Sequence, residues 1–187
     1  MSECVSKRIQ THIPIIPKVS QQAKARRASK RQRWLVNLQT KSQKSKKPQK
    51  MTLNDLYQFA ENDNDITVIS AECDEYKALS LLTPRGKCYI GMDYNEIKTE
   101  REERQYLAHE IGHCVKGAFY SPEADISTIL KQEHRADAEA IKYLVPKEEL
   151  IEALKSGLTE IWQLCEYFDV DVKYIRLAYW EYFDKII

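Results

Sequence analysis

His109, Glu110 and His113 stand at a spacing that suits metal chemistry. Residues four apart on a helix lie on one face, one turn apart, so both imidazoles can hold the same ion. Neutral imidazole is a good ligand for zinc. Glu110 projects to the flank of that face, where its carboxylate can take a proton from a water molecule that the metal activates. The spacing therefore predicts a zinc site with His109 and His113 as ligands and Glu110 as the catalytic base.

The competing interpretation is that this HExxH pattern arose by chance on a solvated helix. Three features of the sequence weigh against it. The surrounding helix is amphipathic, with Leu107, Ile111 and Val115 available for packing. Three of the four histidines lie between positions 109 and 134, and further candidate ligands follow downstream. We therefore interpret the segment as a metal site.

The third ligand must come from outside this segment. An HExxHxxGxxH extension is excluded, because Lys116 and Phe119 occupy the positions where it needs glycine and histidine. The candidates are Glu133, His134 and Asp137 on a second long helix. Glu133 and Asp137 share a face, whereas His134 lies about 100° around the helix. We predict Glu133 as the ligand and Asp137 as a group that orients a ligand imidazole, which leaves a fourth position open for water.

The reaction that such a site predicts is peptide hydrolysis. Zinc polarises the scissile carbonyl, and Glu110 takes the proton of the water and passes it to the leaving amine. A further side chain is expected to stabilise the oxyanion. His134, Tyr120 and Tyr143 are the candidates, and the sequence does not choose between them.

The elements around these residues predict an α+β fold of zincin type. A small antiparallel sheet is expected first, from a β-rich run at 66–70 and two strands, 76–82 and 87–92, on either side of a Pro-Arg-Gly turn. This sheet should pack on the HExxH helix and on the helix that carries the third ligand, and a helical C-terminal part should follow. A first helix is expected to begin after Thr52, and the later ones to span 99–119, 127–145, 147–155, 159–168 and 171–183.

The charge of the 187-residue chain is unevenly distributed. Residues 1–50 carry 14 Lys or Arg and one acid, a net charge of +13. The net charge of the whole chain is +1, so residues 51–187 have a net charge of −12. The basic segment has too little apolar surface to offset the entropy of ordering, and we expect it to be a disordered extension. A nucleic-acid-binding arm is one alternative, and translation from an upstream start, with Met51 as the original first residue, is another. Residues 51–187 are expected to form the zincin-like domain.

The cysteines and the hydropathy pattern favour a cytoplasmic protein. The five cysteines are scattered without a CxxC pair, which argues against a disulfide framework and against a thiolate metal site, so we expect reduced thiols. No stretch of about 18 apolar residues is present. The N-terminus also lacks the apolar region of a signal peptide, so no membrane is expected as a partner. The oligomeric state stays open.

At this point the sequence resembles the ImmA/IrrE family of metallo-endopeptidases. Residues 103–113, which end in Leu-Ala-His-Glu-Ile-Gly-His, look like the family's RxxLAHELGH segment. Residues 133–146 are similar to its ExxANxFAxxLLMP pattern, with Asp137 in place of the frequent Asn and Glu139 where an aromatic residue is usual. The resemblance covers about residues 52–182 and does not include the basic segment. It implies His109, His113 and Glu133 as ligands and Glu110 as the catalytic base.

The resemblance also implies a role in gene regulation. Relatives are often encoded by prophages and conjugative elements, where they act against a helix-turn-helix repressor, and others govern stress responses. The expected partner is therefore a protein substrate, a DNA-binding repressor. The alternative is a metal-containing regulatory protein that sequesters its partner without cutting it.

Residues 161–177 have the pattern of a helix-turn-helix pair, but acidic residues outnumber basic ones there and in the flanking positions. A DNA-binding element needs cations that contact phosphates. We therefore expect a packing or substrate-docking role for this pair. Direct nucleic-acid binding is not expected except through residues 1–50.

Overall fold

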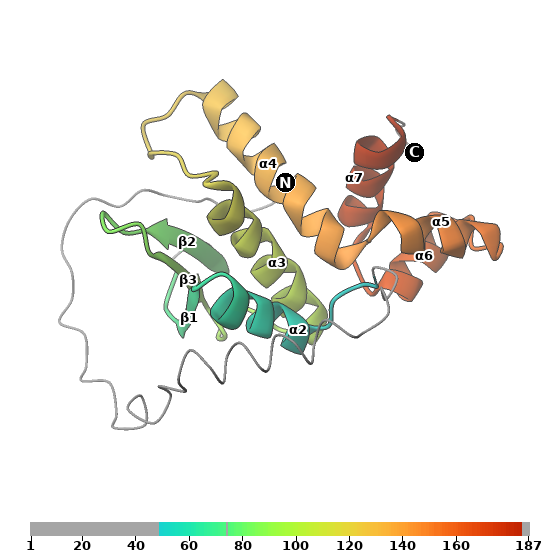
Figure 1. The fold of residues 1–187 in the computed structure, drawn as a ribbon, viewed down its shortest axis with the longest axis horizontal. Coiled ribbons are helices and arrows are strands. Elements are labelled where there is room, and N and C mark those ends of the chain that lie inside the picture. Colours follow the sequence, from blue (N-terminus) through green and yellow to red (C-terminus); the bar gives the residue numbers. More distant parts are fainter. Residues whose placement is uncertain (1–48, 74, 185–187) are drawn as a thin grey trace, which may run out of the picture. The chain divides into compact units, whose positions relative to one another are not determined.

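The computed structural model describes residues 49–73 and 75–184, which form an α+β fold, as the sequence predicted (Figure 1). Residues 1–48, on which the expectations for the basic segment fall, lie outside this part of the chain. Within it, no helix combines the length and the apolar composition needed to cross a membrane. The elements are α2 (Leu53–Gln58), a π-helical segment (Phe59–Asp63), β1 (Thr67–Ser70), β2 (Ala78–Leu82), β3 (Cys88–Met92), α3 (Glu100–Lys116), α4 (Ile126–Leu144), α5 (Lys147–Lys155), α6 (Ile161–Phe168) and α7 (Val172–Phe183).

The three strands form a mixed sheet in the order β1-β3-β2. The hairpin of β2 and β3 is antiparallel, as expected, with Ser80 opposite Ile90. β1 pairs with β3 in parallel, with Val68 opposite Ile90, so the prediction of a wholly antiparallel sheet is wrong. The parallel pairing follows from topology. The hairpin places β2 on one edge of β3, which leaves the other edge for β1, and the pairing of β1 with β3 is not encoded in local sequence.

The two long helices begin and end on ordinary capping signals. Thr99 caps α3 by accepting a hydrogen bond from the backbone of Glu102, and Asp125 caps α4 in the same way. α3 ends at Lys116, three residues before the predicted end, because Gly117 adopts a left-handed conformation with φ of 57°. α4 ends at Leu144, just ahead of Pro146, which cannot continue a helix.

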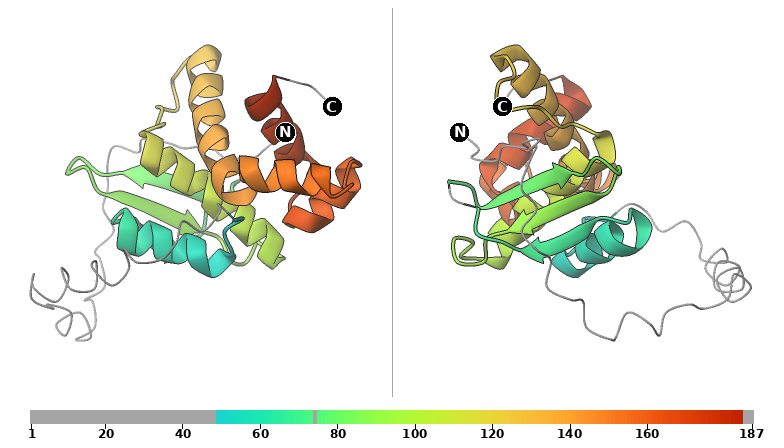
Figure 2. Two further views of the ribbon diagram at one scale, coloured as in Figure 1. Left: turned by 45° about the vertical axis from the view of Figure 1, so that its right-hand side comes forward. Right: turned by 90° about the vertical axis from the view of Figure 1, so that its left-hand side faces the viewer.

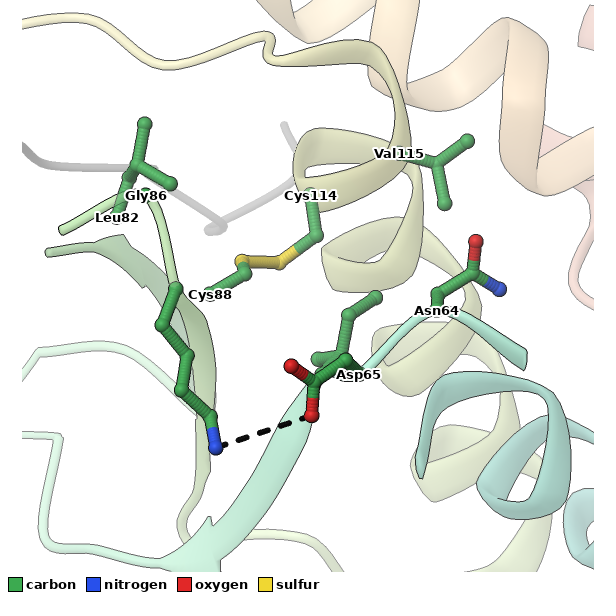
Figure 3. Close-up of a pocket in the computed structure, with 9 residues that line it drawn as sticks. Asn64, Asp65, Leu82, Gly86, Cys88, Cys114 and Val115 are labelled. Carbon is green, nitrogen blue, oxygen red and sulfur yellow. Dashed lines mark ion pairs between the residues drawn. A yellow bond between two sulfur atoms is a disulfide. The ribbon is translucent and has the colours of Figure 1, made fainter. Parts of the chain in front are cut away.

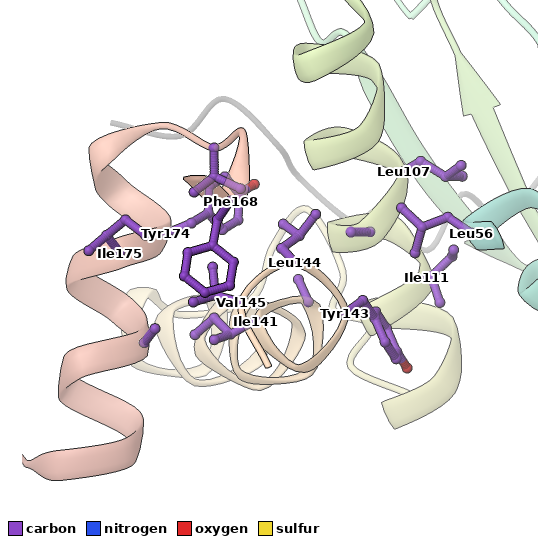
Figure 4. Close-up of a cluster of buried hydrophobic side chains, with 14 of the residues drawn as sticks. Leu56, Leu107, Ile111, Ile141, Tyr143, Leu144, Val145, Phe168, Tyr174 and Ile175 are labelled. Atoms are coloured by element: carbon purple, nitrogen blue, oxygen red, sulfur yellow. The ribbon is translucent and has the colours of Figure 1, made fainter. Parts of the chain in front are cut away.

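A hydrophobic core joins the helices to the sheet. α3 packs against β2 and β3, and α2 packs against α3 (Figure 2). Leu107 and Ile111 are fully buried on the inner face of α3. Figure 4 shows the core continuing across the C-terminal half of α4 to Phe168 and Ile175 of the last two helices. The apolar faces that the sequence predicted for these helices therefore meet in one contiguous core.

α3 and α4 touch backbone to backbone at Gly112. A Cβ atom built on Gly112 would lie 2.4 Å from the carbonyl oxygen of Ala136, so only glycine fits. This contact lies between His109 and His113 on one helix and between Glu133 and Asp137 on the other. The crossing therefore brings the two sets of candidate ligands to the same level.

The turn between α6 and α7 is fastened to α3. The buried guanidinium of Arg104 donates to the carbonyl oxygens of Phe168 and Asp169, each at 2.6 Å. The amide of Gln105 bridges to Asp171 by accepting from its backbone at 2.8 Å. The helix-turn-helix pair is thus packed against the helix that carries the two histidines, in agreement with the packing role expected for it.

Candidate metal centre

Three predicted ligands converge between α3 and α4. One ligand atom from each of His109, His113 and Glu133 lies within 4.8 Å of the others, and we call these three residues the ligand cluster. The Nε2 atoms of the two histidines are 3.0 Å apart. The carboxylate of Glu133 lies 3.3 Å from Nε2 of His109 and 3.4 Å from Nε2 of His113. Two imidazole nitrogens and a carboxylate at these distances can hold a metal ion.

The ring orientations of both histidines suit metal binding. Nδ1 of His109 faces Oδ1 of Asp137 at 2.9 Å, and Nδ1 of His113 faces the carbonyl oxygen of Ala118 at 2.7 Å. Each acceptor requires a proton on Nδ1, which leaves the lone pair of a neutral ring on Nε2, inside the cluster. Residues of the protein therefore select the tautomer that a metal ion needs.

The acidic and imidazole groups of the cluster shift one another's pKa values strongly. Burial alone would lower the pKa of His109, but hydrogen bonds to Asp137 and Glu133 raise it to about 9. Burial would raise the pKa of Glu133, but hydrogen bonds to the two histidines lower it to about 2. The carboxylates around His109 thus favour a positive charge at this position. A divalent cation would supply that charge, so the donor set fits a metal ion such as zinc.

Glu110 lies beside the cluster but is not part of it. Its side chain is fully buried on α3, and its charge is among the causes that raise the pKa of His109. An acid that is buried without serving as a ligand carries a desolvation cost that a purely structural metal site does not require. Its role as catalytic base stays a prediction.

Only one of the three candidates for oxyanion stabilisation reaches the cluster. The hydroxyl of Tyr120 donates to Oε1 of Glu133 at 2.7 Å, and its ring packs near that of His113. His134 instead pairs with Glu181 of α7 at 3.0 Å, and about half of its side chain is exposed. The hydroxyl of Tyr143 donates to Glu139 at 2.8 Å. Tyr120 is therefore the candidate that the fold places at the ligands.

Glu139, which departs from the family pattern, is buried between two cations. Lys116 and Lys142 lie 2.9 Å and 2.7 Å from its Oε2. Burial would raise the pKa of Glu139, but these two lysines and Tyr143 lower it. The acid thus takes part in packing between α3 and α4 and lies away from the ligand atoms.

Sequence reasoning missed Lys173 of α7. Its Nζ lies 3.0 Å from Oδ1 of Asp137, the same oxygen that holds His109. α7 therefore contacts the helix that carries Glu133 at two points, through Asp137 and through the pair of His134 and Glu181. A signal for it existed, because an acid expected at a buried position calls for a cation nearby. The sequence did not indicate which lysine supplies it.

The expectation of reduced cysteines is wrong for one pair. Cys88 of β3 and Cys114 of α3 form a disulfide, with Cα atoms 5.9 Å apart, and they line a cavity of about 270 Å³ together with Asp65 and Lys87 (Figure 3). Among the described residues, Cys73 and Cys165 are outside any disulfide. The paired cysteines are 26 positions apart in the sequence, and their contact forms only when α3 packs on the sheet, so local sequence did not indicate it. None of the ligand cluster lines this cavity.

Comparison of the chain with protein-family models, curated proteins and solved structures finds no match in any of the three.

Proposed function

We propose that this chain is a zinc-dependent endopeptidase of zincin type and a member of the ImmA/IrrE family. The observation that carries the proposal is the combination of the ligand cluster with a fully buried glutamate that is not a ligand. Two imidazoles and one carboxylate leave a coordination position open, as catalytic zinc sites do. The order of the two motifs along the chain supports the assignment to the family.

The roles of the residues follow from their positions. When bound, zinc supplies the Lewis acidity that activates water and polarises a carbonyl group. His109, His113 and Glu133 would hold the ion, and Glu110 would take the proton of the attacking water and return it to the leaving amine. Tyr120, whose hydroxyl donates to Glu133, would donate to the oxyanion.

We further propose that the substrate is a DNA-binding repressor and that its cleavage operates a switch in a mobile element or a stress response. The charge of −12 on residues 51–187 supports this choice, because an acidic surface attracts a basic DNA-binding protein. Repressor binding should then weaken as salt rises, which can be measured by titration at two ionic strengths. Equal affinity at both would remove this argument.

The experiment that tests the activity compares the zinc-loaded wild type with Glu110→Gln on an unfolded protein substrate. We expect both proteins to bind about one zinc, measured by elemental analysis. We expect the variant to lose cleavage by a factor of about 10² to 10⁴, because it lacks the proton acceptor. Full cleavage by Glu110→Gln would contradict the mechanism. Binding of a repressor without fragments from the wild type would instead favour a protein that sequesters its partner.

A further inference from the structure

The first two turns of α4 carry an exposed apolar stripe. Ile126 is 75% exposed and Leu130 is 63% exposed, which makes them the two most exposed large apolar side chains among the described residues. The stripe is part of a firmly capped helix end, because Asp125 accepts hydrogen bonds from Thr128 and Ser127. We refer to Ile126 and Leu130 as the apolar stripe.

The apolar stripe lies on the same face of α4 as the metal-binding residues. Ile126, Leu130, Glu133 and Asp137 are spaced by four, three and four residues, the spacing of one helical face. At a rise of about 1.5 Å per residue, Leu130 lies about 4.5 Å and Ile126 about 10.5 Å along the helix axis from Glu133. The face of α4 that carries the predicted ligand Glu133 is therefore apolar and exposed to solvent in the turns that precede Glu133.

The stripe is open because the neighbouring helix stops. α3 crosses α4 at Gly112 and ends at Lys116, so it covers Glu133 and Asp137 but runs out before Leu130. Figure 1 shows the first turns of α4 extending past the C-terminal end of α3. In the described part of the chain, Leu130 and Ile126 have no element packed over them that would account for their apolar character.

We propose that the apolar stripe binds the substrate beside the bond that is cut, and that it selects an extended peptide segment with uncharged, apolar side chains. This inference rests on the proposed function. An extended peptide advances about 3.3 Å per residue. A peptide whose carbonyl reaches the ligand cluster and which runs along α4 would therefore place a side chain on Leu130 one or two residues from the cut, and another on Ile126 about three residues away. The stripe continues directly from a metal ligand, which favours this occupant over a separate partner protein.

The first experiment measures which peptides are cut. Zinc-loaded full-length protein is incubated with a mixture of random peptides, and the residues around each cut are read by mass spectrometry. We expect apolar residues to be enriched one to three positions from the cut on one side. Leu130→Gln and Ile126→Gln should lower kcat/KM for a peptide with apolar flanks by about tenfold each, and leave an acidic-flanked peptide unchanged. Both residues are exposed, so these variants should fold normally.

The matched control is Trp162→Gln on α6, a large apolar side chain that is 61% exposed but is not on a helix that carries a ligand. It should leave cleavage unchanged. A loss in this control as large as that in Leu130→Gln would overturn the proposal. An unchanged preference of the stripe variants for apolar peptides would also overturn it. If these variants in addition convert a dimer to a monomer in sedimentation, the stripe is an interface between copies of the chain.

The second experiment separates this inference from the proposed activity. Zinc-loaded Glu110→Gln is titrated with a fluorescent apolar peptide and with an acidic counterpart, with and without Leu130→Gln. If Glu110→Gln prefers the apolar peptide and the double variant loses this preference, the stripe is a peptide-binding surface. This result would support the inference even if the wild type cuts no peptide and the proposed proteolytic function fails. Cleavage by the wild type without stripe-dependent binding or preference would overturn the stripe and retain the proteolytic function.

Discussion

The carboxylates beside His109 make its imidazole more basic than a free one. Its pKa is raised from 6.5 to about 9 by Asp137 and Glu133, against the effect of burial. Because the folded-state pKa lies above the unfolded value, this stabilisation of the metal-free protein is fully present below pH 6.5 and is lost as the pH rises through about 9. Zinc competes for the same nitrogen, so proton and metal exclude each other at this residue.

Zinc affinity should therefore depend on pH. Since one proton leaves His109 when zinc binds, we expect the apparent affinity to rise about tenfold per pH unit in neutral solution. It should level off above about pH 9, and competition with a chelator across this range measures it. In Asp137→Asn the plateau should begin at lower pH, because the carboxylate that raises the pKa of His109 is gone. A flat profile in the wild type would show that His109 is neutral in the metal-free protein.

Asp137 fixes the imidazole of His109 through its hydrogen bond to Nδ1. Groups in this position commonly change metal affinity by about 10- to 100-fold when removed. We expect Asp137→Ala to weaken zinc binding by that amount, measured by chelator competition. His134→Gln is the control, because it breaks the neighbouring contact of α4 with α7 and leaves His109 untouched. Equal losses in both variants would mean that Asp137 acts only by holding α7 in place.

At the scale of elements, the crossing of α3 and α4 decides whether the site forms. A methyl group at Gly112 would collide with the backbone of Ala136 and push the helices apart at the level of the ligands. We expect Gly112→Ala to lower the free energy of unfolding by about 1–3 kcal/mol and to weaken zinc binding. Denaturant unfolding and chelator competition measure the two effects. Gly86→Ala, at a turn with φ of +79° and no atom within 4 Å of the added Cβ, should lose stability and keep its zinc affinity.

The disulfide between Cys88 and Cys114 ties α3 to the sheet. Because its cysteines are 26 positions apart in the sequence, the loss of chain entropy in the unfolded state should contribute about 3.5 kcal/mol to stability. We expect a thiol reductant to lower the free energy of unfolding by about this amount in denaturant titrations. Cys88→Ser combined with Cys114→Ser should show the lower stability from the start and no response to reductant. A response in that variant would point to another disulfide.

At the scale of the whole molecule, the charges separate along the chain. Residues 51–187 carry −12, and the turn of the helix-turn-helix pair is occupied by contacts to Arg104 and Gln105. We expect a chain that lacks residues 1–48 to bind no duplex DNA even at low salt, because acidic residues strongly outnumber basic ones in it and repel the phosphates. Fluorescence anisotropy measures the binding. The full chain is the comparison. Retained binding after the deletion would identify α6 and α7 as a DNA-binding element.

The sequence determined much of this molecule through local rules. The spacing of His109 and His113 required one helical face, Thr99 marked the start of α3, and the Pro-Arg-Gly turn marked the hairpin. These features depend on residues within a few positions of one another, which is why they could be predicted. Even Glu133 was predicted correctly as a member of the ligand cluster, because it lies on one face of an amphipathic helix.

Only the tertiary structure decided how these elements meet. The parallel pairing of β1, the disulfide and the contact of Lys173 with Asp137 each join segments far apart in the chain. The carbonyl oxygen of Ala118 that bonds to Nδ1 of His113 belongs to the backbone, so the residue type at position 118 could not predict this contact. These contacts form only when whole helices and the sheet pack against one another. For the candidate metal centre, the close approach of α3 and α4 at Gly112 determines this packing.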